Sequence, residues 1–233
     1  MQFIEKNSFN VRSAVYRLKK EGTGLEFLLF PMIHVGSREF YEEISRRLST
    51  CDLILAEGVK SRRASILTLS YRIVKKIRRM DLITQQDGMR VDGFREKILN
   101  TDMEGRAFDE RWSSLPFVLR AQLFIILPFC VVYLFLFGTR ETLAQNLALE
   151  DLPSSEEIIS KDDSFEQLDS LLVDERDRKL IEHIARLDKE RSEETQLVGI
   201  VYGAFHMRST VAFLIQKLNY RVAKAEWLTV FDL

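Results

Sequence analysis

Two histidines stand in matching surroundings near the two ends of this 233-residue chain. His34 and His206 each follow an apolar, strand-like stretch and precede an amphipathic helical pattern. Each unit then closes with a second apolar stretch that ends on Ala-Glu, at Glu57 and Glu226. Imidazole and carboxylate groups bind divalent metals and transfer protons near neutral pH. Their matching placement makes these four side chains candidates for one shared site.

The elements around these residues decide whether they can meet. If each unit is a strand-helix-strand crossover, both histidines and both glutamates lie at the carboxyl ends of strands. In a parallel sheet those ends share the edge at which α/β proteins bind ligands. The helical pattern after His34 begins with a favourable cap, Ser37, and runs from acidic to basic residues. We expect an α/β fold in which two pseudo-repeated strand-helix-strand units form a central mixed sheet, with a large helical insertion between them.

The chain is long enough for one large domain with a sizeable core, and we expect a single domain, 1–233. The first α/β unit covers 1–60. A mostly helical insertion covers 61–163 and contains the apolar segment 115–138. Late helices and the second α/β unit cover 164–233.

Composition narrows the function classes. The formal net charge of −1 gives no overall electrostatic reason to bind nucleic acid. Cys51 and Cys130 lie far apart in apolar surroundings, which favours two core residues over a disulfide or a thiolate metal site. The first residues lack the apolar segment of a secretory signal, so we expect a cytoplasmic protein.

Each candidate residue also has a purely structural interpretation. Either histidine can cap a helix or bond a carbonyl in the core, and Glu57 can be an edge residue that turns into solvent. Glu226 is the weaker glutamate, because its strand can be an edge strand with one face exposed. Arg176 lies in a run of charges, 174–178, which is typical of a solvated helix face. If it projects inward, its planar fork can bind a carboxylate or an oxyanion.

Four short motifs resemble the TraB/PrgY and Tiki family, which is related to erythromycin esterases and ChaN-like haem-binding proteins. They are HVGS at His34, LILAEGVKSR with Glu57, DERDR with Arg176, and GAFH ending at His206. The family pattern has Gly-x-x-His after an early strand, but a proline, Pro31, stands at that glycine position here. Because proline fixes the backbone angle and donates no hydrogen bond, the geometry near His34 departs from the family pattern.

The resemblance implies that His34, Glu57, Arg176 and His206 form the site. The supporting residues predicted around them are Glu175, Asp102, Gly203 and Glu226. Tiki members are metal-dependent proteases, and erythromycin esterases hydrolyse a lactone with a histidine base, so the resemblance implies a hydrolase.

Our leading hypothesis is hydrolysis of a peptide or a small ester. His34, Glu57 and His206 would hold a divalent metal or orient a water directly, and Arg176 would stabilise the developing oxyanion. Two imidazoles and a carboxylate suit Mn, Co or Zn. The competing hypothesis is a non-catalytic protein that captures a peptide or a haem-like ligand in the same cleft.

The apolar segment Ala121–Gly138 contains one strongly polar residue, Gln122, and a central proline, Pro128. Its hydropathy is borderline for a membrane span. A crossing would separate His34 from His206, so a shared site requires a buried helix, an oligomer contact in a homodimer, or a kinked segment in one leaflet. The basic run 60–79 favours peripheral or monotopic contact with the inner face of the membrane. The alternative is a helical subdomain that packs one apolar helix under a basic one.

Overall fold

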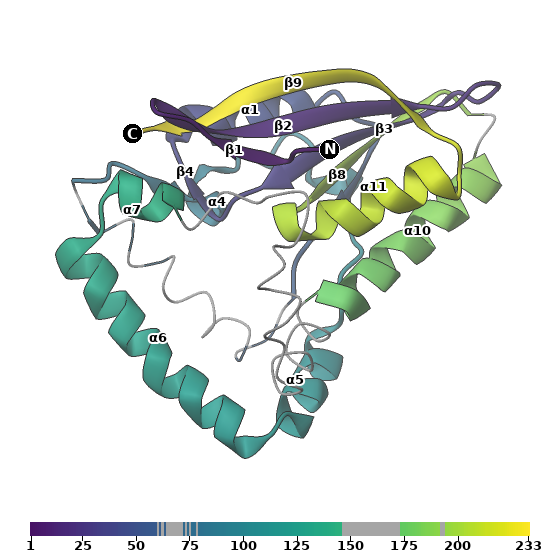
Figure 1. The fold of residues 1–233 in the computed structure, drawn as a ribbon. Coiled ribbons are helices and arrows are strands. Elements are labelled where there is room, and N and C mark those ends of the chain that lie inside the picture. The colour runs from purple at the N-terminus through teal and green to yellow at the C-terminus, as the bar shows by residue number, and fades with distance from the viewer. Residues whose placement is uncertain are drawn as a thin grey trace.

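The computed structural model describes residues 1–59, 61, 63, 72, 74, 76, 77, 79–145, 173–191 and 194–233. Much of the basic run 60–79 and the first part of the helix expected from residue 164 lie outside these described residues. The described part is a mixed α/β fold whose central sheet contains parallel and antiparallel strands, as predicted (Figure 1).

The seven strands of the central sheet are β1 (Ile4–Lys6), β2 (Asn10–Lys19), β3 (Leu25–Met32), β5 (Leu53–Ala56), β7 (Ile98–Asn100), β8 (Gln196–Gly203) and β9 (Arg221–Asp232). Strands β3, β8, β5 and β7 are neighbours in this order and run parallel. Strand β2 pairs antiparallel with β1, β3 and β9. A hairpin joins β2 to β3, and its turn contains Gly22 at φ +76°, a backbone angle that favours glycine.

Two crossovers leave the middle of this sheet in opposite directions. The first runs from β3 through α1 (Arg38–Leu48) to β5, passing β8. The second runs from β8 through α11 (Met207–Gln216) to β9, passing β3 and β2. Because crossovers share one hand, opposite directions place their helices on opposite faces. In Figure 1, α1 lies behind the sheet, whereas α11 and α10 (Glu175–Arg191) lie in front of it.

Both crossovers connect parallel strands, but the two units are not equivalent. Strand β5 lies inside the sheet between β8 and β7, whereas β9 pairs only with β2 among the described strands. Glu57 directly follows β5, whereas Glu226 lies in the middle of β9, opposite Val15. The prediction that both glutamates end their strands is therefore wrong for Glu226, because pairing with β2 extends β9 well beyond it.

Local sequence explains α1, the helix of the first crossover. Ser37 caps it by accepting a hydrogen bond from the backbone N–H of Phe40 at 3.1 Å, as predicted. Apolar residues spaced along one face, including Phe40, Ile44 and Leu48, are buried against the sheet. The opposite face carries the exposed charges of the helix.

Short elements cover the carboxyl edge on the α1 side. They are β4 (Val35–Gly36), β6 (Ile83–Thr84), α4 (Gln85–Gly88) and the 3-10 helix η1 (Arg95–Lys97). Strands β4 and β6 form a separate two-stranded sheet. The backbone N–H of Gln85 donates to the carbonyl of His34 at 2.8 Å, which ties this cover to the chain leaving β3.

Three helices follow β7: α5 (Gly105–Ser114), α6 (Phe117–Phe137) and α7 (Arg140–Gln145). Helix α6 is long and apolar enough to cross a membrane by length and composition, yet only 6% of its most apolar window is buried. Of the three alternatives for this segment, the described residues do not support a buried helix. Cys51 is buried as predicted, but Cys130 of α6 is exposed, because hydropathy does not reveal whether anything covers an apolar helix.

Candidate functional site

Four neighbouring strands bring charged and imidazole side chains to one edge of the sheet. His34 lies just beyond β3, Glu57 directly after β5, and Asp102 just beyond β7. His206 ends the 3-10 helix η3 (Ala204–His206), which directly follows β8. This is the carboxyl edge, at the point where the two crossovers diverge, and α/β folds commonly bind ligands there.

Arg176 joins two of these groups. Its Nε and Nη2 atoms donate to the two carboxylate oxygens of Asp102 at 2.8 and 2.7 Å, and Nη2 also donates to Oε1 of Glu57. The side chains of Arg176 and Glu57 are 12% and 16% exposed, and that of Asp102 is fully buried. Buried charges persist only when they are paired in this way. The prediction that Arg176 projects inward is confirmed, but its described partners are carboxylates of the protein.

The second oxygen of Glu57 is also held. The backbone N–H of Gly203 donates to Oε2 at 2.5 Å, so both carboxylate oxygens have protein partners. Burial by itself would raise the pKa of Glu57, but Arg176, His206, His34 and the Gly203 N–H together hold that pKa below its ordinary value. Glu57 is therefore an ionised carboxylate at neutral pH.

His206 is oriented by an aspartate from another element. Its Nδ1 lies 2.6 Å from Oδ1 of Asp177 in α10, and Ser209 donates to the other oxygen of that carboxylate. A carboxylate at Nδ1 fixes the tautomer with the proton on Nδ1, which leaves Nε2 as an acceptor. Nε2 faces Oε1 of Glu57 at 3.8 Å, a separation longer than a hydrogen bond. The imidazole also packs edge to face against Tyr202, with ring centroids 5.6 Å apart.

Asp177 was missing from the residues predicted for the site. A signal for it existed in the sequence, since Asp177, Leu180, Ile184 and Leu187 follow helical spacing and are the buried residues of α10. A carboxylate on the apolar face of a helix needs a partner inside the protein. Extending the spacing of Leu180, Ile184 and Leu187 by one turn toward the start of the helix predicts that Asp177 faces inward.

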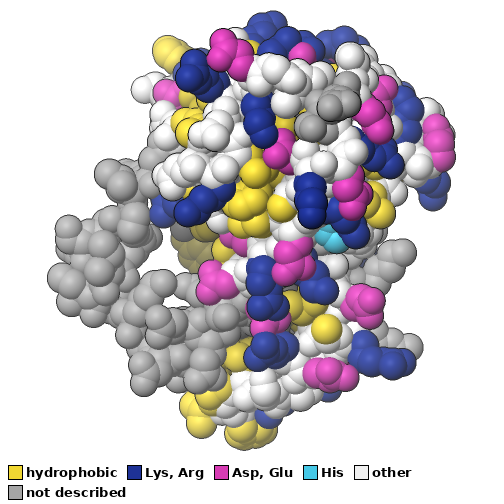
Figure 2. Space-filling view, turned by 90° about the vertical axis from the view of Figure 1, so that its right-hand side faces the viewer, with side chains coloured by type: hydrophobic (Ala, Val, Ile, Leu, Met, Phe, Trp, Pro, Cys, Tyr) yellow, Lys and Arg dark blue, Asp and Glu magenta, His cyan; other side chains and the backbone are white. Residues whose placement is uncertain are grey.

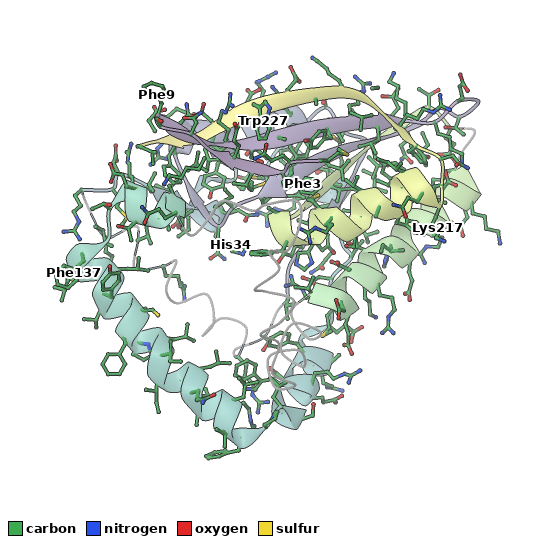
Figure 3. The ribbon with its side chains drawn as sticks, viewed as in Figure 1. Phe3, Phe9, His34, Phe137, Lys217 and Trp227 are labelled. Carbon is green, nitrogen blue, oxygen red and sulfur yellow. The ribbon has the colours of Figure 1, made fainter. Side chains whose placement is uncertain are left out.

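A pocket of about 580 Å³ opens beside Glu57 on the α1 face of the sheet. His34 and Glu57 line it together with polar residues of β6 and α4, namely Thr84, Gln85 and Asp87. Its apolar lining comes from β5, β7, β8 and the segment after α4, with Ile54, Ile98, Val201, Met89 and Phe94. Figure 3 shows His34 at the lower margin of the sheet. Glu57 thus lies between this pocket and the buried His206.

Two predicted supporting residues lie outside this arrangement. Glu226 pairs with Arg47 of α1 at 2.9 Å and with Lys224 at 3.0 Å, on a partly exposed edge strand. Glu175 forms an ion pair with Arg111 of α5. Glu226 is therefore not part of the site, and Glu175 contacts α5 rather than the four groups at the sheet edge.

The predicted metal ligands are only partly assembled. Nε2 of His206 and Oε1 of Glu57 face each other at 3.8 Å, and His34 shares the pocket with Glu57. Among the described residues, no three His, Cys, Asp or Glu side chains are placed as a group that could hold a metal ion. The oxygen of Glu57 that faces His206 also accepts from Arg176. The described side chains supply a pair of candidate ligands rather than a complete set of three.

Comparison with family models, curated proteins and solved structures finds no match for this chain. The resemblance to the TraB/PrgY and Tiki family accordingly stays a prediction from four short motifs, and the site is argued from its own geometry.

Proposed function

We propose that this site hydrolyses an ester or peptide bond with a water molecule activated between His206 and Glu57. One observation carries the proposal: Nε2 of His206 and Oε1 of Glu57 are two acceptors that face each other across 3.8 Å. A water placed between them can donate one hydrogen bond to each, which directs its lone pairs away from both. Asp177 binds Nδ1 of His206 and Arg176 binds Glu57, so both acceptors are held in position.

The proton balance of this reaction follows from the two groups. As the water oxygen bonds to the substrate carbonyl carbon, one water proton passes to Nε2 of His206, and Asp177 stabilises the resulting imidazolium. Glu57 remains ionised and orients the water, because its lowered pKa makes it a weak base. When the carbonyl re-forms, the bond to the amine or alcohol breaks and the leaving group takes the proton from Nε2 of His206. The water proton is thereby returned and the products are an acid and an amine or alcohol.

His34 and Arg176 take different parts in this proposal. His34 lines the pocket beside Glu57 and would bind a polar group of the substrate there. Arg176 acts as a positioning residue, since it binds Glu57 and Asp102. This differs from the oxyanion-binding role first expected for it.

A divalent metal, Mn, Co or Zn, is a further proposal for the same pair. His206 and Glu57 would hold it as a pair of ligands, and when bound it would lower the pKa of a water. Every proton transfer above uses side chains of the chain alone, so the metal is tested separately by chelation.

Ligand capture without chemistry is the alternative function, and the apolar lining of the pocket favours it. A volume of about 580 Å³ is within the usual range for small-molecule sites. In this alternative His34 and Glu57 would bind polar groups of a peptide or a haem-like ligand, and His206 would serve only to position Glu57.

The experiment is a hydrolysis assay on the full chain with chromogenic esters and fluorogenic peptides, before and after EDTA and with each metal restored. His206→Gln and Glu57→Gln are compared with two matched controls, His183→Gln on the exposed face of α10 and Glu226→Gln on β9. We expect a loss of roughly 10²–10⁴-fold at the two site residues and little change at the controls.

The outcomes separate the alternatives. Equal activity of His206→Gln and the wild type would overturn the proposal. Absence of turnover, with haem or peptide binding that survives His206→Gln, would establish ligand capture instead. Activity that EDTA abolishes and one metal restores would assign the water activation to that metal.

A further inference from the structure

Helix α6 presents a wide apolar surface to the outside of the molecule. Exposed positions recur along its whole length, from Phe117, 76% exposed, through Phe129, 72%, to Phe137, 63%. Leu119 is the only residue of the helix that is fully buried. In Figure 1, α6 forms the outer edge of the molecule between α5 and α7. The face formed by α10 and α11 instead carries acidic and basic side chains side by side (Figure 2).

The exposed positions cover more than one side of the helix. At about 100° per residue, Phe124, Ile125, Ile126, Phe129 and Val132 spread over more than half of its circumference. A second protein packed against α6 would cover one stripe of it and leave the remainder in water. Lipid chains cover such a helix from every exposed side. The width of the apolar surface therefore favours lipid over a second copy of the chain.

The end of α6 is tied to the α/β body. Arg79 donates from Nε to the carbonyl of Gly138 at 2.8 Å, directly after the helix. Arg140 donates to the carbonyls of Met80 at 2.6 Å and Asp232, the last residue of β9, at 2.9 Å. In α7, Leu143 is buried in the main hydrophobic core. This end of α6 cannot leave the body without breaking these contacts.

The start of α6 is tied to the same body through α5. Leu119 packs in a small core with Met103, Phe108 and Trp112, against which Val59 also packs. Val59 lies close behind Glu57 in the chain, at the carboxyl edge of the sheet. Both ends of α6 are therefore in contact with the α/β body or with residues at its carboxyl edge.

A crossing helix needs its ends on opposite sides of the bilayer. The 21 residues of α6 span about 31 Å, which matches the hydrocarbon core, but the body that holds both ends is folded and largely polar outside. We propose that α6 lies in the plane of a lipid bilayer and embeds its outward face in one leaflet, with the α/β body and its site on a single side. Arg79 and Arg140 at its end add attraction to anionic headgroups.

Cys130 provides the test, because it is exposed on α6 while Cys51 is buried and burial raises the pKa of its thiol to about 12. A bimane dye attached to Cys130 of the full chain is mixed with vesicles of phosphatidylcholine and phosphatidylglycerol. We expect a blue shift and quenching by doxyl groups on the lipid chains. A dye that vesicles do not quench would overturn the proposal. If sedimentation also shows a dimer, a second copy covers α6 instead.

Sidedness is tested with two new thiols in a Cys130→Ser background, Ser114→Cys before α6 and Thr142→Cys after it. Protein is bound to preformed vesicles and treated with a membrane-impermeant maleimide. We expect both thiols to react from outside. Protection of only one of them would show that α6 crosses the bilayer and would overturn the in-plane arrangement.

Matched substitutions separate insertion of α6 into the bilayer from nonspecific adsorption of exposed apolar residues to vesicles. Ile125→Gln with Phe129→Gln removes two outward residues of α6, and Phe9→Gln with Val222→Gln removes two exposed apolar residues elsewhere. Vesicle flotation should weaken by at least about tenfold for the first pair and hardly change for the second. Equal weakening by both pairs would contradict the proposal, provided that circular dichroism shows both variants folded.

Discussion

Oδ1 of Asp177 lies 2.6 Å from Nδ1 of His206, although one residue belongs to α10 and the other to the turn after β8. The contact fixes which nitrogen of His206 faces Glu57. An aspartate outside the predicted site thus determines the proton acceptor of the proposed reaction.

Replacing Asp177 with asparagine should lower kcat by about 10²–10³-fold, because an amide no longer stabilises the imidazolium. KM should change little, since Asp177 does not line the pocket. Steady-state kinetics on the best ester substrate measures both, and Asp92→Asn at an exposed position is the matched control. A variant with wild-type kcat would remove Asp177 from the mechanism.

Replacing Arg176 with methionine should destabilise the fold by about 3–5 kcal/mol, because it leaves Glu57 and Asp102 as buried carboxylates without their cation. Urea unfolding followed by circular dichroism gives the difference. Arg178→Met on the exposed side of α10 should cost less than about 0.5 kcal/mol. Equal losses in the two variants would show that the buried pairing contributes nothing specific.

Acid should weaken the fold through Glu57. Its pKa is lower in the folded protein than in the unfolded chain, so its contribution to stability is complete above the unfolded value. That contribution is lost as the pH falls through the lower folded value, because the protonated group no longer binds Arg176 as an anion. Midpoints of urea unfolding between neutral and strongly acidic pH should therefore fall less steeply for Glu57→Gln than for the wild type. Glu182→Gln, on the exposed face of α10, should leave the slope unchanged.

Replacing Gly203 with alanine should reduce kcat by about tenfold with little loss of stability. A Cβ at this position would lie 3.2 Å from Oε2 of Glu57 and displace a carboxylate that Arg176 holds in place. Gly93→Ala adds a methyl group where nothing lies within 4 Å, and should have no effect on activity. An active Gly203→Ala enzyme would mean that the position of Glu57 has more tolerance than its contacts indicate.

The positions of His34, Glu57 and His206 were predictable because strand ends can be read from local sequence. An apolar run that stops at a polar residue marks the end of a buried strand, and parallel strands bring such ends to one edge. The α/β class and the caps of α1 follow from the same local signals. The placement of Arg176 inside the protein was one of two interpretations of its charge run, and its pairing with Glu57 decides between them.

The errors arise where a partner distant in sequence decides the structure. Glu226 looks like the end of a strand, but pairing with β2 carries β9 beyond it. The helical spacing of α10 indicates that Asp177 faces inward, but its pairing with His206 depends on how the helix packs against the sheet. Cys130 looks like a core residue because its neighbours are apolar, yet the described residues bury little of α6.

The ion pair between Arg176 and Glu57 joins residues that are 119 positions apart in the chain. Closing so large a loop costs entropy that the contact recovers only after β5, β8 and α10 are already in place. The pair is therefore expected to form late in folding, and shorter-range structure such as the β2–β3 hairpin can assemble before it. In a refolding experiment, hydrolytic activity would then return only with the slowest kinetic phase, after most of the circular dichroism signal of helices and strands has returned.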